Sequence, residues 1–180
     1  NGVFEKTEKG TPQGGNISPI LSNIMLNELD KELESRGLQF VRYADDCIIF
    51  TKSRKAAERV MENITKFIEK KLRLKVNRKK SKVDRPWRIK YLGFSFYQNK
   101  GKVEIRIHQK SIKKFKEKIR EITSRSNAMR METRFLKLRQ VIKGWVNYFK
   151  IANMKMIAQR LDEWIRRRIR MCYWKQWKKI

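Results

Sequence analysis

The hydrophobic pattern of the first part of the chain predicts two amphipathic helices. The first is expected to begin with Ser18 as its N-cap and Pro19 in its first turn, and to end at Gly37. Its apolar residues recur every three or four positions, at Ile20, Leu21, Ile24, Met25, Leu29 and Leu33. The second is expected to follow a cap at Ser53, with an apolar stripe of Ala57, Val60, Met61, Ile64, Phe67, Ile68 and Leu72.

Short apolar runs predict two β-hairpins, one between these helices and one after the second helix. Residues 40–43 and 47–51 flank the Ala-Asp-Asp sequence at 44–46, so two aspartates are expected at or beside the first turn. Further along, two strand-like runs flank the turn-forming Asn-Lys-Gly sequence at 99–101.

From residue 110 onward the pattern is helical throughout. Ser111 is expected to cap a helix with an apolar face of Ile112, Phe115, Ile119 and Ile122. A second stripe consists of Phe135, Leu138, Val141, Ile142, Trp145 and Phe149. A third consists of Ile157, Leu161, Trp164, Ile165, Ile169 and Cys172. The sequence therefore predicts an α+β fold, with a mixed part at residues 1–109 and a three-helix unit at residues 110–180.

Charge is the feature that points to a partner. The chain has 46 Lys and Arg against 18 Asp and Glu, a formal net charge of +28, and residues 110–180 carry +17 of it. Such dense like charge repels itself unless a polyanion neutralises it, so nucleic acid is the first candidate partner and an anionic membrane the second. No stretch approaches 18 consecutive apolar residues, the length that a membrane span requires.

The same composition excludes several kinds of site. His108 is the only histidine, which argues against a histidine base and a zinc centre. Cys47 and Cys172 lie far apart and outside any metal-ligand spacing, which fits a reducing compartment without a disulfide framework.

The paired carboxylates of Asp45 and Asp46 have two interpretations. Aspartate tolerates turn geometry, so the pair can be no more than the turn itself. Against this, hairpin turns prefer a glycine that is absent here, and adjacent carboxylates repel unless something positive lies between them. Mg²⁺ is typically held by one or two carboxylates together with substrate phosphates. A turn that directs both side chains outward suits that function.

Residues 10–20 form a second candidate site. Gly10, Pro12, Gly14 and Gly15 give a segment of little side-chain bulk directly before a helix N-terminus. Backbone N–H groups at such a place can receive phosphate or lie close to a nucleotide. A plain connecting loop explains the same residues.

Several segments, in order and spacing, resemble the group II intron-encoded reverse transcriptases, also called maturases. The segments that show this resemblance are TPQGGNISPILSNIMLNELDKEL, FVRYADDCIIF, KYLGFSF, IKGWVNYFK and WIRRRIRMCYWKQWKK. The Tyr-Ala-Asp-Asp sequence follows the Pro-Gln-Gly-Gly sequence by about thirty residues, and the tryptophan-rich C-terminal pattern is similar to that of the intron type. The resemblance covers the chain from about residue 9 to its end.

The resemblance implies a role for each matching residue. Asp45 and Asp46 are expected to be the palm aspartates that hold catalytic magnesium, with manganese as a substitute. The nucleotide pocket is expected to include Gln13, Gly14, Gly15, Tyr43 and Ala44. The turn that grips the primer strand is expected at Leu92, Gly93 and Phe94. In such a nucleotidyl transferase, two metals about 3.5–4 Å apart serve the primer hydroxyl and the leaving pyrophosphate.

The resemblance also implies the organisation and the partners. Residues 1–109 are expected to be a palm portion and residues 110–180 a thumb, or maturase, domain. The expected function is RNA-directed DNA polymerisation with a role in RNA splicing. Expected partners are intron RNA, an RNA template with a DNA primer, and dNTPs, without a membrane, in a bacterial cytoplasm or an organelle.

One departure from the family pattern bears on activity. These enzymes use a further aspartate on a strand before the Pro-Gln-Gly-Gly segment, and only ten residues of this sequence precede Thr11. Asp30, on the polar side of its helix, and Asp84, in a basic loop, are not expected to replace it. We therefore expect this chain alone to bind metal weakly and to polymerise poorly or not at all. The fingers and first palm strand are expected as a partner segment.

The C-terminal helices combine aromatic and basic residues. Trp145 and Trp164 are expected in the core because they lie on apolar stripes, whereas Tyr173, Trp174 and Trp177 also invite base stacking. Sequence-independent RNA binding is expected from Arg166, Arg167, Arg168, Arg170, Lys175, Lys178 and Lys179.

Two functions therefore compete. The first is a group II intron reverse transcriptase and maturase, and the second is a non-catalytic RNA-binding remnant of such an enzyme. A basic protein of membrane surfaces is disfavoured, because the helices alternate core and solvent faces instead of pairing one basic face with one apolar face.

Overall fold

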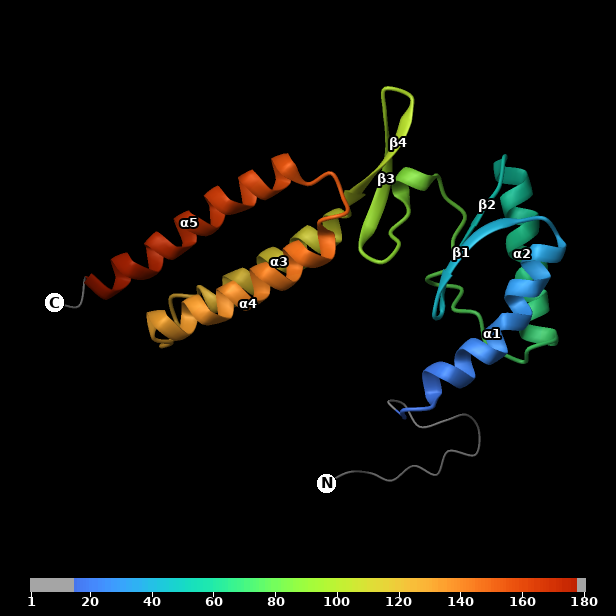
Figure 1. Cartoon of the computed structure of the whole chain (residues 1–180), viewed down its shortest axis with the longest axis horizontal. Helices are drawn as coiled ribbons and strands as arrows, with labels where there is room; N and C mark the ends of the chain where they lie inside the picture. Colours follow the sequence, from blue (N-terminus) through green and yellow to red (C-terminus); the bar gives the residue numbers. More distant parts are fainter. Residues whose placement is uncertain (1–14, 178–180) are drawn as a thin grey trace. The chain divides into compact units, whose positions relative to one another are not determined.

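The computed structural model describes residues 15–177, which form a mixed α+β fold with two antiparallel hairpins and five α-helices (Figure 1). The chain divides into two compact units, one up to Asp84 and one from Arg85 onward. The elements of the first unit are α1 (Ser18–Ser35), β1 (Gln39–Tyr43), β2 (Asp46–Phe50) and α2 (Arg54–Lys70). Those of the second are η1 (Pro86–Arg88), β3 (Phe94–Asn99), β4 (Lys102–Ile107), α3 (Gln109–Ile122), α4 (Met131–Phe149) and α5 (Lys155–Trp177). The predicted α+β fold is confirmed.

In the first unit, helices α1 and α2 cover one face of the β1–β2 hairpin (Figure 1). Leu29 and Leu33 of α1 are buried together with Ile64 of α2. The hairpin adds the inward-facing residues Phe40, Cys47 and Ile49. Because one face of the hairpin packs on this small core, its other face is directed away from the two helices.

Helix α1 ends as the sequence predicts and begins one residue earlier than expected. Gly37 adopts a left-handed φ of +65°, and its N–H donates to Glu34 O at 2.8 Å, while the N–H of Leu38 donates to Leu33 O at 3.0 Å. These two bonds satisfy carbonyls that a helix end leaves unpaired. The predicted cap at Ser18 is wrong, because Ile17 occupies the N-cap and Ser18 is the first helical residue.

Only the C-terminal half of the α1 stripe is buried. Leu29 and Leu33 lie in the core, but Ile20, Leu21, Ile24 and Met25 are exposed. The apolar residues of the hairpin and of α2 pack only against Leu26, Leu29 and Leu33 of α1, so Ile20, Leu21, Ile24 and Met25 stay exposed among the residues that the structure describes. Helix α2 follows its prediction, with the Ser53 hydroxyl accepting from the Ala56 N–H at 3.2 Å.

The second unit begins with the predicted hairpin. Strands β3 and β4 pair up to Asn99 and Lys102, which leaves Lys100 and Gly101 as a two-residue turn. Both turn residues have positive φ, +47° and +80°, and a type I′ turn requires this. The turn at residues 99–101 is confirmed.

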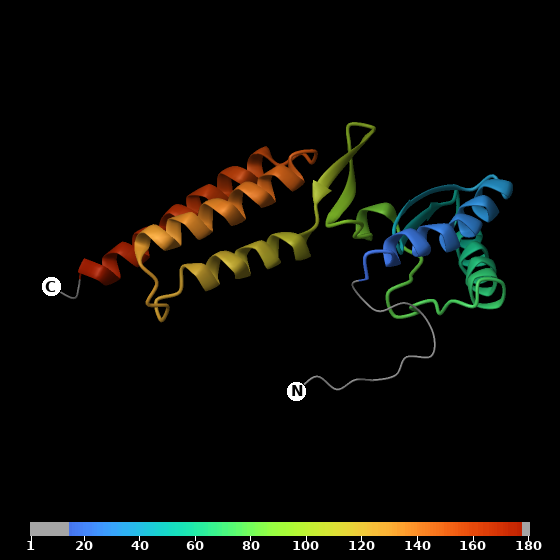
Figure 2. The ribbon, with the colours of Figure 1, turned by 60° about the horizontal axis from the view of Figure 1, so that its bottom comes forward.

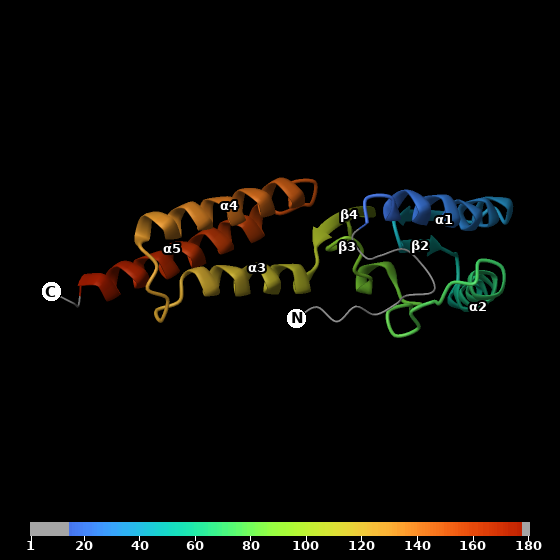
Figure 3. The same ribbon diagram turned by 90° about the horizontal axis from the view of Figure 1, so that it is seen from below.

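Helices α3, α4 and α5 follow the hairpin and run side by side (Figures 2 and 3). Their buried core consists of Phe115, Ile119, Ile122, Leu138, Leu161 and Ile165. Trp145 and Trp164 pack against it, which confirms the core prediction for both. The ring of Trp145 stacks on that of Phe115, with centroids 4.4 Å apart. The three helices predicted from the apolar stripes are thus present, and they belong to a compact unit that begins at Arg85 and includes the β3–β4 hairpin.

Two details of this unit differ from the sequence predictions. Helix α3 is capped by His108, whose Nδ1 accepts from the Lys110 N–H at 3.1 Å, and not by Ser111. Phe135 is exposed instead of lying in the core, and its ring faces that of Tyr173 with centroids 6.2 Å apart. Both differences reflect contacts between elements that are distant in sequence. Within residues 15–177, no helix has the length and apolarity of a membrane span.

Candidate functional site

The turn of the first hairpin presents two adjacent carboxylates. Strand β1 ends at Tyr43 and pairs there with Asp46, the first residue of β2, so Ala44 and Asp45 form the turn. Both aspartates are exposed, as is Tyr43. The Ser22 hydroxyl of α1 lies 3.5 Å from Asp45 Oδ1. The prediction that the aspartates lie at or beside the turn is therefore confirmed, and their side chains are accessible to a ligand.

A buried arginine braces this turn against helix α1. The Arg42 guanidinium donates to both carboxylate oxygens of Asp30, at 2.7 and 2.5 Å, and the two side chains are only 12% and 20% exposed. Its Nη1 also donates to Asn23 Oδ1 at 3.1 Å and to the Ala44 carbonyl at 3.2 Å. The hydrogen bond with Asp30 raises the pKa of Arg42 above its ordinary value.

This brace explains two features of the turn. Ala44 has a φ of +49°, a conformation that costs a residue with a Cβ about 1 kcal/mol or more. The bond from Arg42 to its carbonyl helps to hold it there. Asp30, whose predicted inability to replace a third metal ligand stays a prediction, is paired with Arg42. The sequence analysis missed Arg42 and Asn23.

The cysteine beside the carboxylates is not a nucleophile at neutral pH. Cys47 pairs with Arg42 across the hairpin and faces the core of the first unit. Burial raises the pKa of its thiol to about 11, the Asp30 carboxylate adds to the rise, and the Arg42 guanidinium opposes it. Since the thiolate is the reactive form, Cys47 serves packing.

The donor set fits a hard cation in part. Asp45 and Asp46 offer only carboxylate oxygens, which Mg²⁺ prefers. Over residues 15–177, however, no cluster of three or more His, Cys, Asp or Glu side chains could hold a metal ion.

The glycine-rich segment falls at the edge of the described residues. Gln13 and Gly14 lie outside them. Gly15 accepts a hydrogen bond from the Ser18 N–H at 3.1 Å, just before α1 begins. The assignment of these three residues to a nucleotide pocket stays a prediction.

The second predicted turn, at Leu92 and Gly93, is held by both neighbouring helices of its own unit. Leu92 has φ +48° and Gly93 φ +85°. The Gly93 carbonyl accepts from the Ser111 hydroxyl at 2.9 Å and from the His108 N–H at 3.0 Å. The Tyr148 hydroxyl of α4 donates to the Leu92 carbonyl at 2.9 Å.

Aromatic rings support the same turn from behind. Phe94 stacks on Tyr148, with centroids 5.6 Å apart, and meets the edge of Phe149 at 5.0 Å. A Cβ on Gly93 would lie 3.1 Å from the Phe149 ring and 3.2 Å from Ser111 Oγ. The sequence signal for these supports was the Tyr-Phe pair of the IKGWVNYFK segment.

A Gly93→Ala variant is expected to lose about 1–3 kcal/mol of unfolding free energy. Alanine is strained at a φ of +85°, and its Cβ would lie too close to the Phe149 ring. Urea denaturation followed by circular dichroism measures this loss. The matched control is Gly144→Ala, where nothing lies within 4 Å of the added Cβ. Equal stability of both variants would contradict the constraint.

The basic residues of α5 divide into two groups. Arg168 and Lys175 face the C-terminal end of α3. Arg168 Nε donates to Thr123 Oγ1 at 3.0 Å, its Nη2 donates to Thr123 O at 3.1 Å, and Lys175 Nζ donates to Arg125 O. Cations at a helix C-terminus are favourable, so these two residues stabilise the unit.

Arg134 of α4 reinforces the same helix end from within the core. It is only 4% exposed, and its Nη1 donates to Ile122 O at 2.7 Å and Ser124 O at 3.3 Å. Its Nη2 donates to Asn127 O at 3.0 Å and Met129 O at 3.2 Å. Its Nη1 also lies 3.5 Å from Cys172 Sγ of α5. Among the described residues, four backbone carbonyls and this thiol surround the buried charge, and no carboxylate pairs with it. The sequence analysis did not single out Arg134.

Three further predicted RNA-binding residues lie on the other side of α5. Arg166, Arg167 and Arg170 are exposed. Arg166 Nε lies 2.9 Å from Asp162 Oδ2 in an ion pair whose side chains are mostly exposed, so that pair holds it weakly. Lys178 and Lys179 lie outside the described residues. The RNA-binding assignment of the whole set stays a prediction.

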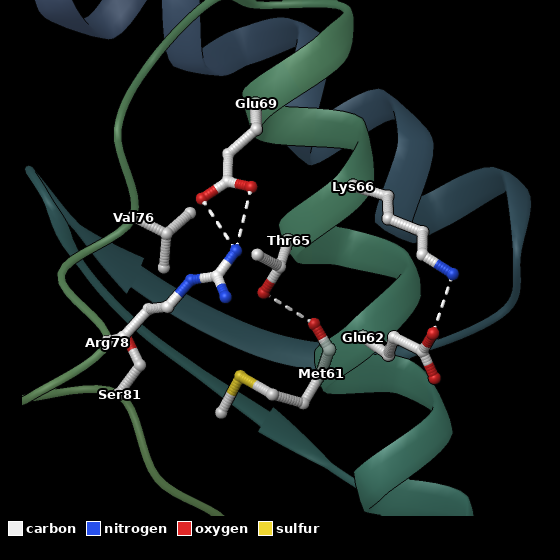
Figure 4. A pocket seen from close by; sticks show the side chains of 8 residues that line it. All are labelled: Met61, Glu62, Thr65, Lys66, Glu69, Val76, Arg78 and Ser81. Atoms are coloured by element: carbon white, nitrogen blue, oxygen red, sulfur yellow. Dashed lines mark hydrogen bonds and ion pairs between the residues drawn. The ribbon is translucent and has the colours of Figure 1, made fainter.

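A hollow of about 400 Å³ lies elsewhere in the first unit, between α2 and the segment after it (Figure 4). Arg78 pairs with Glu69 at 3.1 Å, and Lys66 pairs with Glu62 at 2.6 Å (Figure 4). Both acidic side chains thus face cations of the chain itself, and neither Asp45 nor Asp46 lines the hollow. The hollow is not the carboxylate site.

Comparison with known proteins finds one match in the N-terminal part of the chain and another in its C-terminal helices. The family model described as reverse transcriptase (RNA-dependent DNA polymerase) matches residues 1–96, and the model of the group II intron maturase-specific domain matches residues 112–180. Protein YkfC of Escherichia coli (strain K12) is 33% identical over 116 aligned residues, with 46% of this chain and 30% of that protein covered. The group II intron-encoded protein LtrA of Lactococcus lactis subsp. cremoris is 46% identical over 48 residues, 27% of this chain and 8% of that protein.

The fold and these matches define a reverse-transcriptase palm segment joined to maturase-type helices. The chain belongs to the reverse transcriptase family, in its group II intron-encoded, maturase-containing group. The resemblance found in the sequence is thereby confirmed. The chain spans less than a third of the length of the curated relatives it matches.

Proposed function

We propose that this chain supplies the metal-binding turn, the primer-strand turn and the RNA-binding helices of an RNA-directed DNA polymerase that also acts as a maturase. The observation that carries the proposal is the exposed carboxylate pair at a hairpin turn braced by Arg42, inside the segment that matches reverse transcriptases. In this proposal residues 1–109 are the palm portion and residues 110–180 the thumb, or maturase, domain.

The proposed chemistry assigns the carboxylates to a divalent metal, magnesium or manganese. When bound, the metal lowers the barrier to attack by the primer hydroxyl and neutralises the leaving pyrophosphate. Asp45 and Asp46 provide the oxygen ligands, and the brace through Arg42 keeps their turn in a fixed orientation. Reverse transcriptases as a family use divalent metal ions, which supports this assignment.

The substrates follow from the same assignment. Gln13, Gly14, Gly15, Tyr43 and Ala44 line the nucleotide pocket for a dNTP. Leu92, Gly93 and Phe94 support the primer strand through a turn that α3 and α4 hold in place.

The partners in this proposal are an RNA template with a DNA primer, and intron RNA, bound in a bacterial cytoplasm or an organelle. The basic residues that contact RNA are Arg166, Arg167, Arg168, Arg170, Lys175, Lys178 and Lys179. Arg168 and Lys175 also bond to backbone carbonyls at and after the end of α3. In this proposal they attract RNA by longer-range electrostatics, whereas Arg167 and Arg170 contact phosphates directly.

A second function, a non-catalytic RNA-binding remnant, is favoured by one observation. Residues 15–177 bring no third acidic ligand to Asp45 and Asp46. For this reason we expect the 180-residue chain by itself to extend a primer poorly or not at all.

Primer extension with Mg²⁺, dNTPs and an RNA template annealed to a DNA primer tests the proposal. The chain is assayed alone and mixed with a polypeptide that carries the fingers and first palm strand of a group II intron reverse transcriptase. Extension only in the mixture supports the polymerase. RNA binding without extension in either case identifies the remnant, and robust synthesis by the chain alone contradicts the expectation that its ligand set is incomplete.

A further inference from the structure

The outward side of α5 carries an unusual pair of exposed aromatic residues. Trp174 and Trp177 are 67% and 65% exposed, in contrast to the half-buried Trp145 and Trp164 of the same unit. Large apolar side chains exposed together on one side of a helix mark an interaction surface.

These tryptophans continue a line of arginines. Arg167, Arg170, Trp174 and Trp177 follow each other at spacings of three, four and three residues, so they lie along one side of α5. The opposite side of the helix carries Leu161, Ile165 and Cys172, all buried. We call the outward set of four residues the Arg–Trp stripe.

The charge along the stripe is positive, with exposed Glu163 one turn before its first residue, Arg167. From Trp164 to Trp177 the helix has no acidic residue. Arg168 and Lys175 are bound to the segment after α3, whereas Arg167 and Arg170 point outward and are exposed. The stripe therefore joins cations that can meet phosphates to flat rings that can meet bases.

A further ring extends the aromatic surface onto the neighbouring helix. Tyr173 lies between Trp177, with centroids 6.2 Å apart, and the exposed Phe135 of α4, also at 6.2 Å. The Tyr173 and Trp177 rings are inclined by 33°. These contacts hold Trp177 near Tyr173 while leaving most of its surface open.

We infer that the Arg–Trp stripe binds single-stranded RNA, with unpaired bases stacking on Trp174 and Trp177 and the adjoining phosphates paired with Arg167 and Arg170. Stacking on an exposed aromatic ring requires an unstacked base, which a duplex does not offer. The surface thus distinguishes unpaired segments from helical ones. The inference rests on the proposed function, because it specifies which form of RNA the C-terminal helices bind.

The test compares two RNAs on the full 180-residue chain. One is a CA-repeat single strand of about 12 nucleotides, within the span of one single-strand-binding surface. The other is an RNA duplex of the same length. Both are fluorescently labelled, and affinity is measured by anisotropy over a series of salt concentrations. The stacking variant is Trp174→Leu/Trp177→Leu.

The expected result is selective. The double variant binds the single strand at least about ten-fold more weakly, because it loses two stacking surfaces, and binds the duplex as before. The Arg167→Gln/Arg170→Gln variant reduces the log–log salt slope for the single strand by about 1.4, or 0.7 for each lost phosphate contact. Trp87→Leu is the matched control, since Trp87 is also exposed and lies in the same compact unit.

Other outcomes overturn the inference in different ways. Equal losses for single strand and duplex, or no loss, would mean that the tryptophans do not stack on bases. A double variant that changes only the sedimentation behaviour of the chain would assign the surface to a second copy of the chain. If the unaltered chain bound neither RNA, the proposed RNA-binding function would itself fail. Thermal unfolding by circular dichroism verifies that each variant is folded.

Discussion

Replacing Arg134 with methionine is expected to lower the unfolding free energy of the second compact unit by about 3–5 kcal/mol. The substitution removes four hydrogen bonds to the carbonyls of Ile122, Ser124, Asn127 and Met129. The bond to Ile122 is buried and the other three are partly buried. A buried carbonyl left without a partner costs about 1–3 kcal/mol, and water can replace part of the partly buried bonds. The loss approaches the whole stability of a small domain.

Urea denaturation of the chain, followed at the helical circular-dichroism signal, measures this effect. Arg139→Met is the control, because Arg139 is exposed on the same helix, and its replacement should change stability by no more than about 0.5 kcal/mol. Arg134→Lys should recover only part of the loss, since an ammonium group cannot copy the planar fork of donors. An unchanged urea midpoint for Arg134→Met would contradict the role of these carbonyl bonds.

Changing either Asp45 or Asp46 to asparagine is expected to reduce primer extension about a thousand-fold or more. Each change removes a negative charge and one anionic oxygen ligand from a pair that has no third acidic neighbour among residues 15–177. The measurement is Mg²⁺-dependent extension in the mixture that contains the fingers and first palm strand.

Glu58→Gln serves as the control, because Glu58 is an exposed carboxylate on α2 of the same unit. It should leave extension unchanged. RNA binding measured in parallel should be the same for all variants, since the exposed pair supplies no cation for phosphate. Full activity of either aspartate variant would contradict the prediction that the replaced carboxylate is required for primer extension.

The features that sequence predicted well are those decided by neighbours along the chain. The Ser53 cap, the glycine end of α1 at Gly37 and the turn at Lys100 and Gly101 depend on residues within one turn of each other. The apolar stripe of α5 was also found, because a helix that packs along its whole length repeats the same spacing.

The features that sequence did not predict arise from contacts between distant segments. Ser111 bonds to Gly93, eighteen residues earlier, instead of capping its own helix. Phe135 has the right spacing for the core, but the place is taken by the neighbouring Arg134, whose charge is satisfied by the segment after α3. No local pattern distinguishes an arginine that folds inward from one that faces solvent.

The candidate site follows the same division. The positions of Asp45 and Asp46 at a turn could be read from two apolar runs and their spacing. The brace that orients them could not, because it joins Arg42 to Asp30 and Asn23, twelve and nineteen residues away. Tyr148 supports the Leu92 turn from fifty-six residues away, with the same consequence.

The guanidinium bridge from Arg42 has a mechanical consequence for the first unit. The Arg42 side chain bonds both to Asp30 of helix α1 and to the Ala44 carbonyl. The position of the helix and that of the acidic turn are therefore coupled. The N-terminal end of the same helix exposes the apolar residues Ile20 and Ile24. Any displacement of α1 relative to the hairpin therefore also moves the turn that carries Asp45 and Asp46.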